Sequence, residues 1–368
     1  MRFCKFATIL VFSSLVVLAF SQDEFGCRDE RNDVVDWFLV YKYPIRTIHT
    51  NEFVREGKGH AYITSNRISN VWTHSGRSIE DENNILGNTL SPLYKEEQRK
   101  NLLYFMYNDQ TPTHTYQGGG HAKGVMAGDK KGGFWMVHSV PNFVASATTN
   151  KYTYPSTELQ FGQIFLCLSL KPKNLETAGK LMRINRIQIY EKSIPADLKA
   201  KYPELVKTAE ENMSAEDCST QMPRGSPKPT KENFKLPGNL PIRVFAKPPC
   251  HTIPKGDFDI YSDFVVPDLK VNMLVQTMPM GETPQGSSCD GTYKLVNVKE
   301  TRVAGVQIPT EDDNSKWAVS DSQAKPWICI GDINRDPSLK RRGGGAVCVK
   351  NKPLWEAYHK IVIERETC

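Results

Sequence analysis

The chain carries one pattern of residues twice, and this repeat limits its possible folds more than any other feature. The first copy consists of His121, Ala122, Lys123, Trp135 and Asn142. The second copy consists of Asn314, Ser315, Lys316, Trp327 and Asn334. Six residues separate Trp from Asn in both copies, and the gaps between Lys and Trp are eleven and ten residues. The repeat indicates two related halves about a pseudo-twofold axis, with both copies at one central site.

The residue types in the repeat suit phosphate chemistry. On an extended strand, residues two apart point to the same face, so His121 projects with Lys123. The two repeated lysines supply positive charge for a phosphate, and an imidazole can attack phosphorus or transfer a proton near neutral pH. The amides that could donate to the phosphate oxygens belong to Asn142 and Asn334. Together these groups predict a phosphodiester site that works without a metal.

Each of these residues also has an ordinary structural explanation. A lone H-x-K is commonly solvated, the two tryptophans suit a core, and the asparagines can cap local backbone. The glycine triplets 118–120 and 343–345 either let the backbone approach a ligand or form turns. His138 lies on the first repeat's strand, where we expect a structural role. No G-x-S-x-G, H-E-x-x-H, Walker or G-x-G-x-x-G motif offers another chemistry, and the repetition favours the functional explanation.

The amino terminus indicates the secretory pathway. Residues 1–21 form a basic start, a short apolar run and a small-residue cleavage site, which is the layout of a signal peptide. No later stretch reaches 18 apolar residues, so we expect no membrane anchor. With 39% hydrophobic and 24% charged residues, the remainder has globular composition. Loss of Arg2 and Lys5 lowers the formal charge from +6 to +4, which permits a polyanionic partner without requiring one.

The cysteines fit an oxidising compartment. Nine are present, and removal of Cys4 with the signal leaves eight, an even number that suggests four disulfides. Zinc binding is the alternative, but no C-x-x-C pair occurs. The triplet Asn212-Met213-Ser214 is a glycosylation sequon.

The pattern of apolar residues mixes strands and helices. Strands are expected at 35–41, 133–140 and 163–170, and helices at 173–182, 195–213 and 355–365. The run LLYFMY at 102–107 fits either type. Residues 219–241 are rich in Pro, Lys and Gly and are expected to form a surface loop or a connection between the halves.

Several blocks, in this order, make the chain resemble the deoxyribonuclease II family of acid endonucleases. The blocks are VDWF at 35–38, LSPLY at 90–94, YNDQ at 107–110, GHAKG at 120–124, GGFWMVHSVPNF at 132–143, DNSKW at 313–317, WICIGDINR at 327–335 and RGGGAVC at 342–348. The resemblance implies a phospholipase-D-like α/β fold, with two pseudo-symmetric mixed α/β halves around one central cleft. It places the domain at 22–368, with a first half at about 27–195, a connection at about 196–245 and a second half at about 246–368.

The resemblance also implies an activity. Members of this family are secreted or lysosomal proteins that cut DNA at acid pH without a metal or other cofactor and leave 3′-phosphate ends. Their catalytic pattern is one H-x-K motif in each half. Here the first is intact as His121 and Lys123, whereas Asn314 holds the histidine's place beside Lys316. An amide cannot attack phosphorus or exchange a proton near pH 5, so we expect reduced turnover; Asp312 or Asp313 could substitute as an acid.

The same resemblance implies a disulfide pairing. It joins Cys27 to Cys167, Cys289 to Cys368, and Cys329 to Cys348, which leaves Cys218 to pair with Cys250.

Three functions remain open at this point. The chain is an acid endonuclease with an altered site, a secreted DNA-binding protein that has lost most turnover, or a paralogue that binds a host or cell-surface protein. The retained lysines and asparagines favour the nuclease, with DNA as substrate or ligand. The oligomeric state is not indicated by the sequence.

Overall fold

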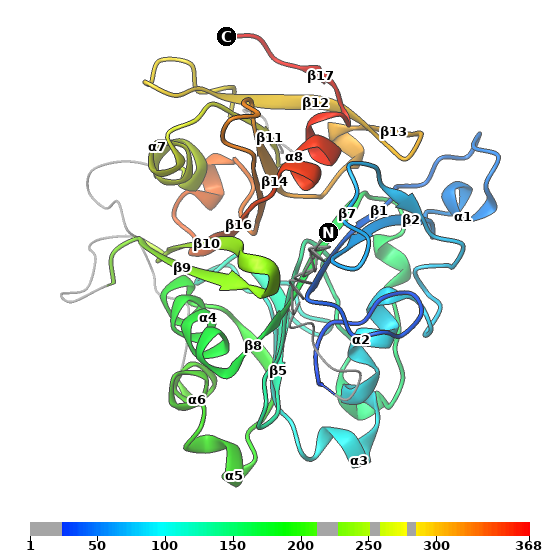
Figure 1. Cartoon of the computed structure of the whole chain (residues 1–368), viewed down its shortest axis with the longest axis vertical. Helices are drawn as coiled ribbons and strands as arrows, with labels where there is room; N and C mark the ends of the chain where they lie inside the picture. Colours follow the sequence, from blue (N-terminus) through cyan, green and yellow to red (C-terminus); the bar gives the residue numbers. More distant parts are fainter. Residues whose placement is uncertain (1–23, 212–226, 251–257, 278–284) are drawn as a thin grey trace, which may run out of the picture.

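The computed structural model describes residues 24–211, 227–250, 258–277 and 285–368 (Figure 1). The expected signal peptide, the sequon at Asn212 and the cysteine at 218 lie outside these ranges. No helix within them has the length and apolar character needed to cross a bilayer.

Two β-sheets form the frame of the molecule; the first is antiparallel, and the second contains one parallel pair. The first runs in the order β3 (Thr73–His74), β2 (His60–Thr64), β1 (Trp37–Lys42), β7 (Gln163–Leu170), β6 (Gly133–His138), β5 (Lys123–Gly128), β4 (Leu103–Asn108) and β8 (Ile189–Ser193). The second runs in the order β13 (Val306–Pro309), β12 (Leu295–Val303), β11 (Met273–Gln276), β14 (Trp317–Ser320), β15 (Trp327–Gly331), β16 (Gly344–Lys350), β10 (Leu240–Lys247) and β9 (Thr230–Leu236), and β17 (Val362–Arg365) pairs with β12.

The two sheets share one strand order. In the first sheet β2, β1, β7, β6, β5, β4 and β8 are successive neighbours, and β9, β10, β16, β15, β14, β11 and β12 follow the same path in the second. The corresponding pairs are antiparallel up to β4 and β11. The halves differ at both edges: β2 follows β1 in the chain whereas β9 precedes β10, and β4 and β8 are antiparallel whereas β11 and β12 are parallel. The prediction of two related mixed α/β halves is therefore confirmed.

Short helices cover and separate the sheets. They are α1 (Glu52–Arg55), α2 (Ile85–Tyr94), α3 (Glu96–Arg99), α4 (Pro172–Asn185), α5 (Ala196–Lys199), α6 (Pro203–Glu210), α7 (Val266–Leu269) and α8 (Lys352–His359). Figure 1 shows α4 beside β9 and β10, and it also contacts β6 and β16 of both sheets. Its residues Leu175, Leu181 and Met182 belong to a central core that both sheets share. Two outer cores lie on the far faces, with α2 over the first sheet and α7 over the second.

Strand register shows how the two copies of the repeat correspond. Gly124, which follows the first lysine, pairs with Val137 of β6. Trp317, which follows the second lysine, pairs with Ile330 of β15. Val137 and Ile330 therefore occupy matching positions, and both point into the central core.

This register corrects the sequence match at the tryptophans. Three residues before these matching positions are Phe134 on β6 and Trp327 on β15. Trp327 is therefore equivalent to Phe134 and not to Trp135. Trp135 faces the central core, whereas Trp327 faces the outer core of the second half. The offset of one residue reflects the unequal gaps of eleven and ten, and a shift of one residue reverses the face on a strand.

Other expectations at the level of elements are confirmed in part. The strands at 37–42, 133–138 and 163–170 and the helix at 172–185 are present, and LLYFMY contributes to β4. The helix expected at 195–213 is wrong as one element, because it divides into α5 and α6 and restarts at Pro203, whose ring fits the first turn. Within the loop or connection expected at 219–241, residues 230–236 form β9 and the strand β10 begins at Leu240. The last expected helix ends at His359, and Val362–Arg365 joins the second sheet.

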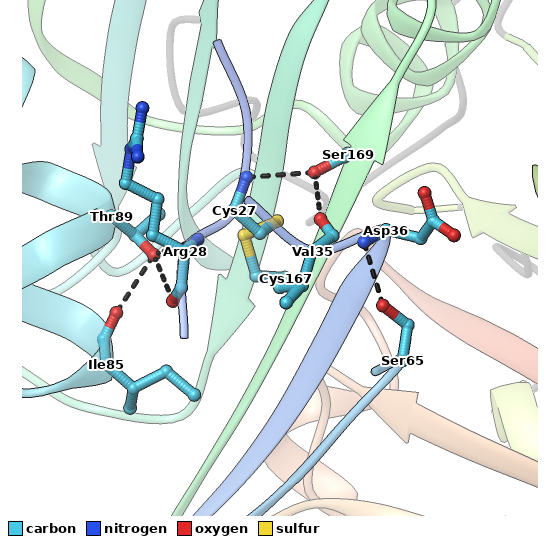
Figure 2. The surroundings of a disulfide bond; sticks show 9 residues. All are labelled: Cys27, Arg28, Val35, Asp36, Ser65, Ile85, Thr89, Cys167 and Ser169. Atoms are coloured by element: carbon cyan, nitrogen blue, oxygen red, sulfur yellow. Dashed lines mark hydrogen bonds between the residues drawn. A yellow bond between two sulfur atoms is a disulfide. The ribbon is translucent and has the colours of Figure 1, made fainter. Parts of the chain in front are cut away.

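Three of the expected disulfides lie within the described ranges: Cys27–Cys167, Cys289–Cys368 and Cys329–Cys348. Cys250 is also disulfide-bonded, and its expected partner at 218 lies outside the described residues. Figure 2 shows that the first bond attaches the amino-terminal segment to β7. Ser169 of β7 supports the same attachment, because its hydroxyl accepts from the Cys27 N–H and donates to the Val35 carbonyl.

Candidate active site

The first H-x-K motif is bonded through its backbone to the other half of the molecule. The N–H of His121 donates to the carbonyl of Gly343 at 2.8 Å, and the N–H of Gly343 donates to the carbonyl of Gly119 at 3.0 Å. The two segments run parallel here. The segment before β5 therefore pairs with the segment before β16, and we call such a backbone pairing between the two halves a crossing.

The second H-x-K position is bonded to the first half in the same way. The N–H of Asn314 donates to the carbonyl of Gly162 at 2.9 Å, and the N–H of Gly162 donates to the carbonyl of Asp312 at 2.7 Å. This segment precedes β14 and crosses the one before β7, and these strands correspond to β5 and β16 of the first crossing. Backbone geometry thus places Asn314 where the other half has His121, independently of the sequence pattern.

Glycine is required where the chains cross. A side chain at Gly343 would collide with the main-chain oxygen of Asn185, and one at Gly162 would collide with the carboxylate of Asp313. The close approach of two backbones explains these glycines better than a turn does.

A buried lysine in each half holds the crossing segment. Lys42 ends β1, and its ammonium donates to the carbonyls of Glu158, Leu159 and Phe161 at 2.6–2.8 Å. Lys247 ends β10, the matching strand, and donates to the carbonyl of Lys340. Both side chains are buried, and burial lowers the pKa of Lys42 well below its ordinary value. Neither lysine could be assigned a role from the sequence, because a single Lys at the end of a strand carries no pattern.

One carboxylate organises the first motif. Asp109, directly after β4, accepts from His121 Nδ1 at 2.7 Å and from Lys123 Nζ at 2.6 Å. Arg342 reaches across from the second half and donates to the same carboxylate at 3.2 Å. Burial opposes ionisation of Asp109, but its interactions with His121 and Lys123 outweigh it and hold its pKa well below the usual range.

This arrangement defines the protonation of the imidazole. Burial lowers the pKa of His121 to about 4, against the opposing effect of Asp109. An ionised carboxylate can only accept, so Nδ1 carries the proton. The Nε2 lone pair of the neutral ring is then available for attack on phosphorus or for accepting a proton.

The second motif keeps its lysine but has a different local structure. Lys316 Nζ donates to the main-chain and side-chain oxygens of Asn314, each at 3.0 Å. The amide of Asn314 donates in turn to the carbonyl of Ser139 at 3.1 Å. Burial, followed by repulsion from Lys123, lowers the pKa of Lys316 to about 7. The bond from Asn314 to Ser139 and the repulsion between Lys123 and Lys316 show that the two motifs are neighbours.

Three side chains near Asn314 could carry a proton in its place, but each takes part in another interaction. Asp312 forms an ion pair with Arg46 at 3.0 Å. The carboxylate of Asp313 is buried and accepts from the Tyr41 hydroxyl, and burial raises its pKa. His138 packs against Phe143 and Phe165 in the outer core, and burial lowers its pKa well below the ordinary value.

The two asparagines of the repeat differ in their surroundings. Asn142 has a left-handed backbone (φ 58°), and its N–H donates to the carbonyl of Gln110, next to Asp109. Asn334 is buried, and its Oδ1 has no hydrogen-bond partner among the described residues. Rotation of that amide would present Nδ2, the donor that a phosphate oxygen requires. The described part of the chain contains no cluster of His, Cys, Asp or Glu side chains suited to holding a metal ion.

Comparisons with known proteins agree with this geometry. The family model described as deoxyribonuclease II matches residues 26–368. Cell-death-related nuclease 7 of Caenorhabditis elegans is 34% identical over 98% of this chain and 92% of its own length. Plancitoxin-1 of Acanthaster planci is 31% identical over 96% and 95% of the two chains. Deoxyribonuclease-2-alpha of Rattus norvegicus is 30% identical over 93% and 94%.

Proposed function

The chain belongs to the deoxyribonuclease II family, and we therefore propose that it hydrolyses DNA phosphodiester bonds. We propose that it does so at acid pH and leaves 3′-phosphate ends. The observation that carries the proposal is the group formed by His121, Asp109 and Lys123, with Lys316 facing it from the other half. It combines a nucleophile of defined tautomer with two cations for one phosphate.

The geometry supports a role for each group. Lys123 and Lys316 hold the non-bridging oxygens of the scissile phosphate. His121 Nε2 attacks phosphorus, and the Asp109 carboxylate stabilises the positive charge that develops on the ring. Arg342 keeps Asp109 ionised and in place. The protein's own side chains thus supply both the charge and the nucleophile, and we propose that no metal is needed.

Asn314 is the reason to propose reduced turnover. Its side chain can donate and accept hydrogen bonds, but it cannot carry a proton to a leaving oxygen. Loss of a positioned acid–base group costs roughly 10²- to 10⁴-fold in rate.

We also propose that the protein is secreted or delivered to lysosomes. The motive is the signal-like sequence at 1–21, together with seven disulfide-bonded cysteines among the described residues. The mature protein would then meet DNA outside the cytosol.

A second candidate function follows from the same asparagine. If Asn314 removes turnover entirely, the retained lysines describe a protein that binds DNA without cutting it, or a paralogue that has moved to another partner. Salt-sensitive DNA binding with no cleavage would favour the first of these.

The decisive experiment is a plasmid-nicking assay at pH 5 with EDTA present, comparing the natural protein with His121→Ala. We expect nicking by the natural protein and none by the variant. The ends should resist extension by a polymerase until a phosphatase removes the 3′-phosphate. Ends that extend directly would contradict the proposed polarity of cleavage, and equal nicking by both proteins would contradict the role of His121.

A further inference from the structure

The proposed reaction leaves one proton without a carrier. When His121 attacks phosphorus, the 5′-oxygen departs with a negative charge and needs a proton. Asn314 cannot give one, and Asp312, Asp313 and His138 are held in other interactions. The reaction therefore needs another acid near Asn314.

Glu158 lies on the Asn314 side of the site and is linked to it by a chain of hydrogen bonds. The Asn314 amide donates to the Ser139 carbonyl at 3.1 Å. The Ser139 hydroxyl donates to Gln163 Oε1 at 2.5 Å. The Gln163 amide donates to Glu158 Oε2 at 3.4 Å. Glu158 also ends the short helix η2 (Ser156–Glu158), four residues before Gly162, which crosses the Asn314 segment.

Glu158 and Lys123 belong to the same face of the first sheet. Lys123 and Val125 are two residues apart on β5, and Gln163 and Phe165 are two apart on β7, so each pair shares a face. Val125 and Phe165 both line the outer core of this half. Lys123 and Gln163 therefore project to that face as well, and the bond from Gln163 brings the carboxyl of Glu158 to it.

The surroundings of Glu158 suit a group that gives and takes a proton. Its exposed fraction is 8%, close to the 9% of His121. Burial raises its pKa above the ordinary value of a glutamic acid, against the opposing effects of Thr157, Lys42, Lys123 and Lys316. Its two side-chain hydrogen bonds, from Thr157 and Gln163, are both 3.4 Å long and therefore weak. Tyr154 is the remaining titratable neighbour, and it stays neutral because burial raises its pKa.

We propose that Glu158 is the general acid and base that replaces the missing histidine of the second half. This inference rests on the proposed hydrolytic function. In the first step, His121 Nε2 bonds to phosphorus, the bond from phosphorus to the 5′-oxygen breaks, and that oxygen takes the proton of Glu158. In the second step, the Glu158 carboxylate takes a proton from water while the water oxygen bonds to phosphorus. The bond to Nε2 then breaks, which restores the imidazole, the protonated Glu158 and a 3′-phosphate end.

Asp332 is the competing carboxyl, since burial raises its pKa to about 7 and the charges of Lys123 and Lys316 act on it, but its side chain faces the interior. It follows β15, and its Oδ2 accepts from the N–H of Gly345 at 2.9 Å. It also lines an interior cavity with Trp135, Val137 and Leu181 of the central core. That cavity lies against α4 between the sheets, on the opposite face from Lys123.

The test compares four proteins in metal-free cleavage at pH 5: the natural chain, Glu158→Gln, Asn314→His and the double variant. We expect Glu158→Gln to lower kcat about 10²-fold in the natural background, with little change in KM. In the Asn314→His background the restored imidazole carries the proton, so Glu158→Gln should cost little. The matched control is Glu311→Gln, at an exposed glutamate of the adjoining segment, which should leave cleavage unchanged.

The outcomes separate the two proposals. An unchanged rate for Glu158→Gln, or the same loss in both backgrounds, overturns the role of Glu158 and leaves the nuclease assignment standing. Absence of cleavage by both the natural chain and Asn314→His overturns the nuclease assignment itself.

A second readout needs no substitution at Glu158. Because a general acid must be protonated, cleavage falls as pH rises through its pKa. Replacing a carboxyl by an imidazole, whose ordinary pKa is about 6.5, should move the upper limb of the kcat–pH profile to higher pH in Asn314→His. An upper limb at the same pH in both proteins would overturn the proposal, even if Glu158→Gln failed to fold.

Discussion

At the scale of single residues, Asp109 controls the first motif, because its carboxylate accepts from both His121 and Lys123. His121, Lys123, Asn314 and Lys316 are visible because the pattern repeats. Asp109 lies outside the repeat, and its role depends on a contact between β4 and β5 that no local spacing reveals. Residues that act through tertiary contacts are therefore the ones that a single sequence hides.

The pKa values of the site predict a bell-shaped dependence of cleavage on pH. His121 must be neutral to attack, so activity is lost as pH falls through about 4. Glu158 must be protonated to act as the acid, so activity falls as pH rises through its raised pKa, and the loss of charge from Lys316 near pH 7 removes what remains. Initial rates of metal-free cleavage between pH 3 and 8 should therefore peak at acid pH. An optimum above pH 8 would contradict this assignment.

Substitution of Asn314 by histidine should increase the cleavage activity. Asn314→His restores a proton carrier next to Lys316 without disturbing a buried core, so cleavage at pH 5 should rise about 10²-fold. The double variant His121→Ala with Asn314→His should be inactive, because the nucleophile is absent. The melting temperature should change little. Equal rates for the natural protein and Asn314→His would show that position 314 does not limit the reaction.

At the scale of elements, periodicity predicted long segments and failed where tertiary structure decides. β7 and α4 were predicted because each carries one continuous pattern. The tryptophan match failed because a spacing in the sequence does not show a slip of one residue between strands. The stretch at 230–247 was missed because β9 is polar along most of its length and is held mainly by pairing with β10.

The lysines that hold the crossing segments predict losses of stability. Lys42→Met removes the donor from three carbonyls and should lower the free energy of unfolding by about 3 kcal/mol. Thermal unfolding at pH 7 measures this, with Lys100→Met as control, since Lys100 pairs only with exposed Glu97 on α3. Cleavage by Lys42→Met should fall even below its melting temperature, because the Gly162 crossing loses its support. A melting temperature equal to that of the control would contradict the role assigned to Lys42.

At the scale of the whole molecule, DNA binding should depend on charges from both halves. Binding through lysines is governed by release of counterions, so log K should fall linearly with log salt, with a slope of roughly −0.9 for each phosphate held. Lys316→Gln should weaken binding for all sequences and make the slope less steep by about 1. Fluorescence anisotropy with a labelled duplex at pH 5 measures both. An affinity that does not change with salt concentration would indicate a partner other than DNA.

The reciprocal crossing of the two halves has a consequence for how such a site can change over evolutionary time. In a symmetric dimer encoded by one gene, any substitution strikes both catalytic motifs at once. Here both motifs lie in one polypeptide, and each is bonded to the opposite half through main-chain atoms. One motif can therefore exchange its imidazole for an amide while the other keeps its own, and the frame that presents both is unaffected. The presence of both halves in one polypeptide thus makes an unequal division of labour heritable.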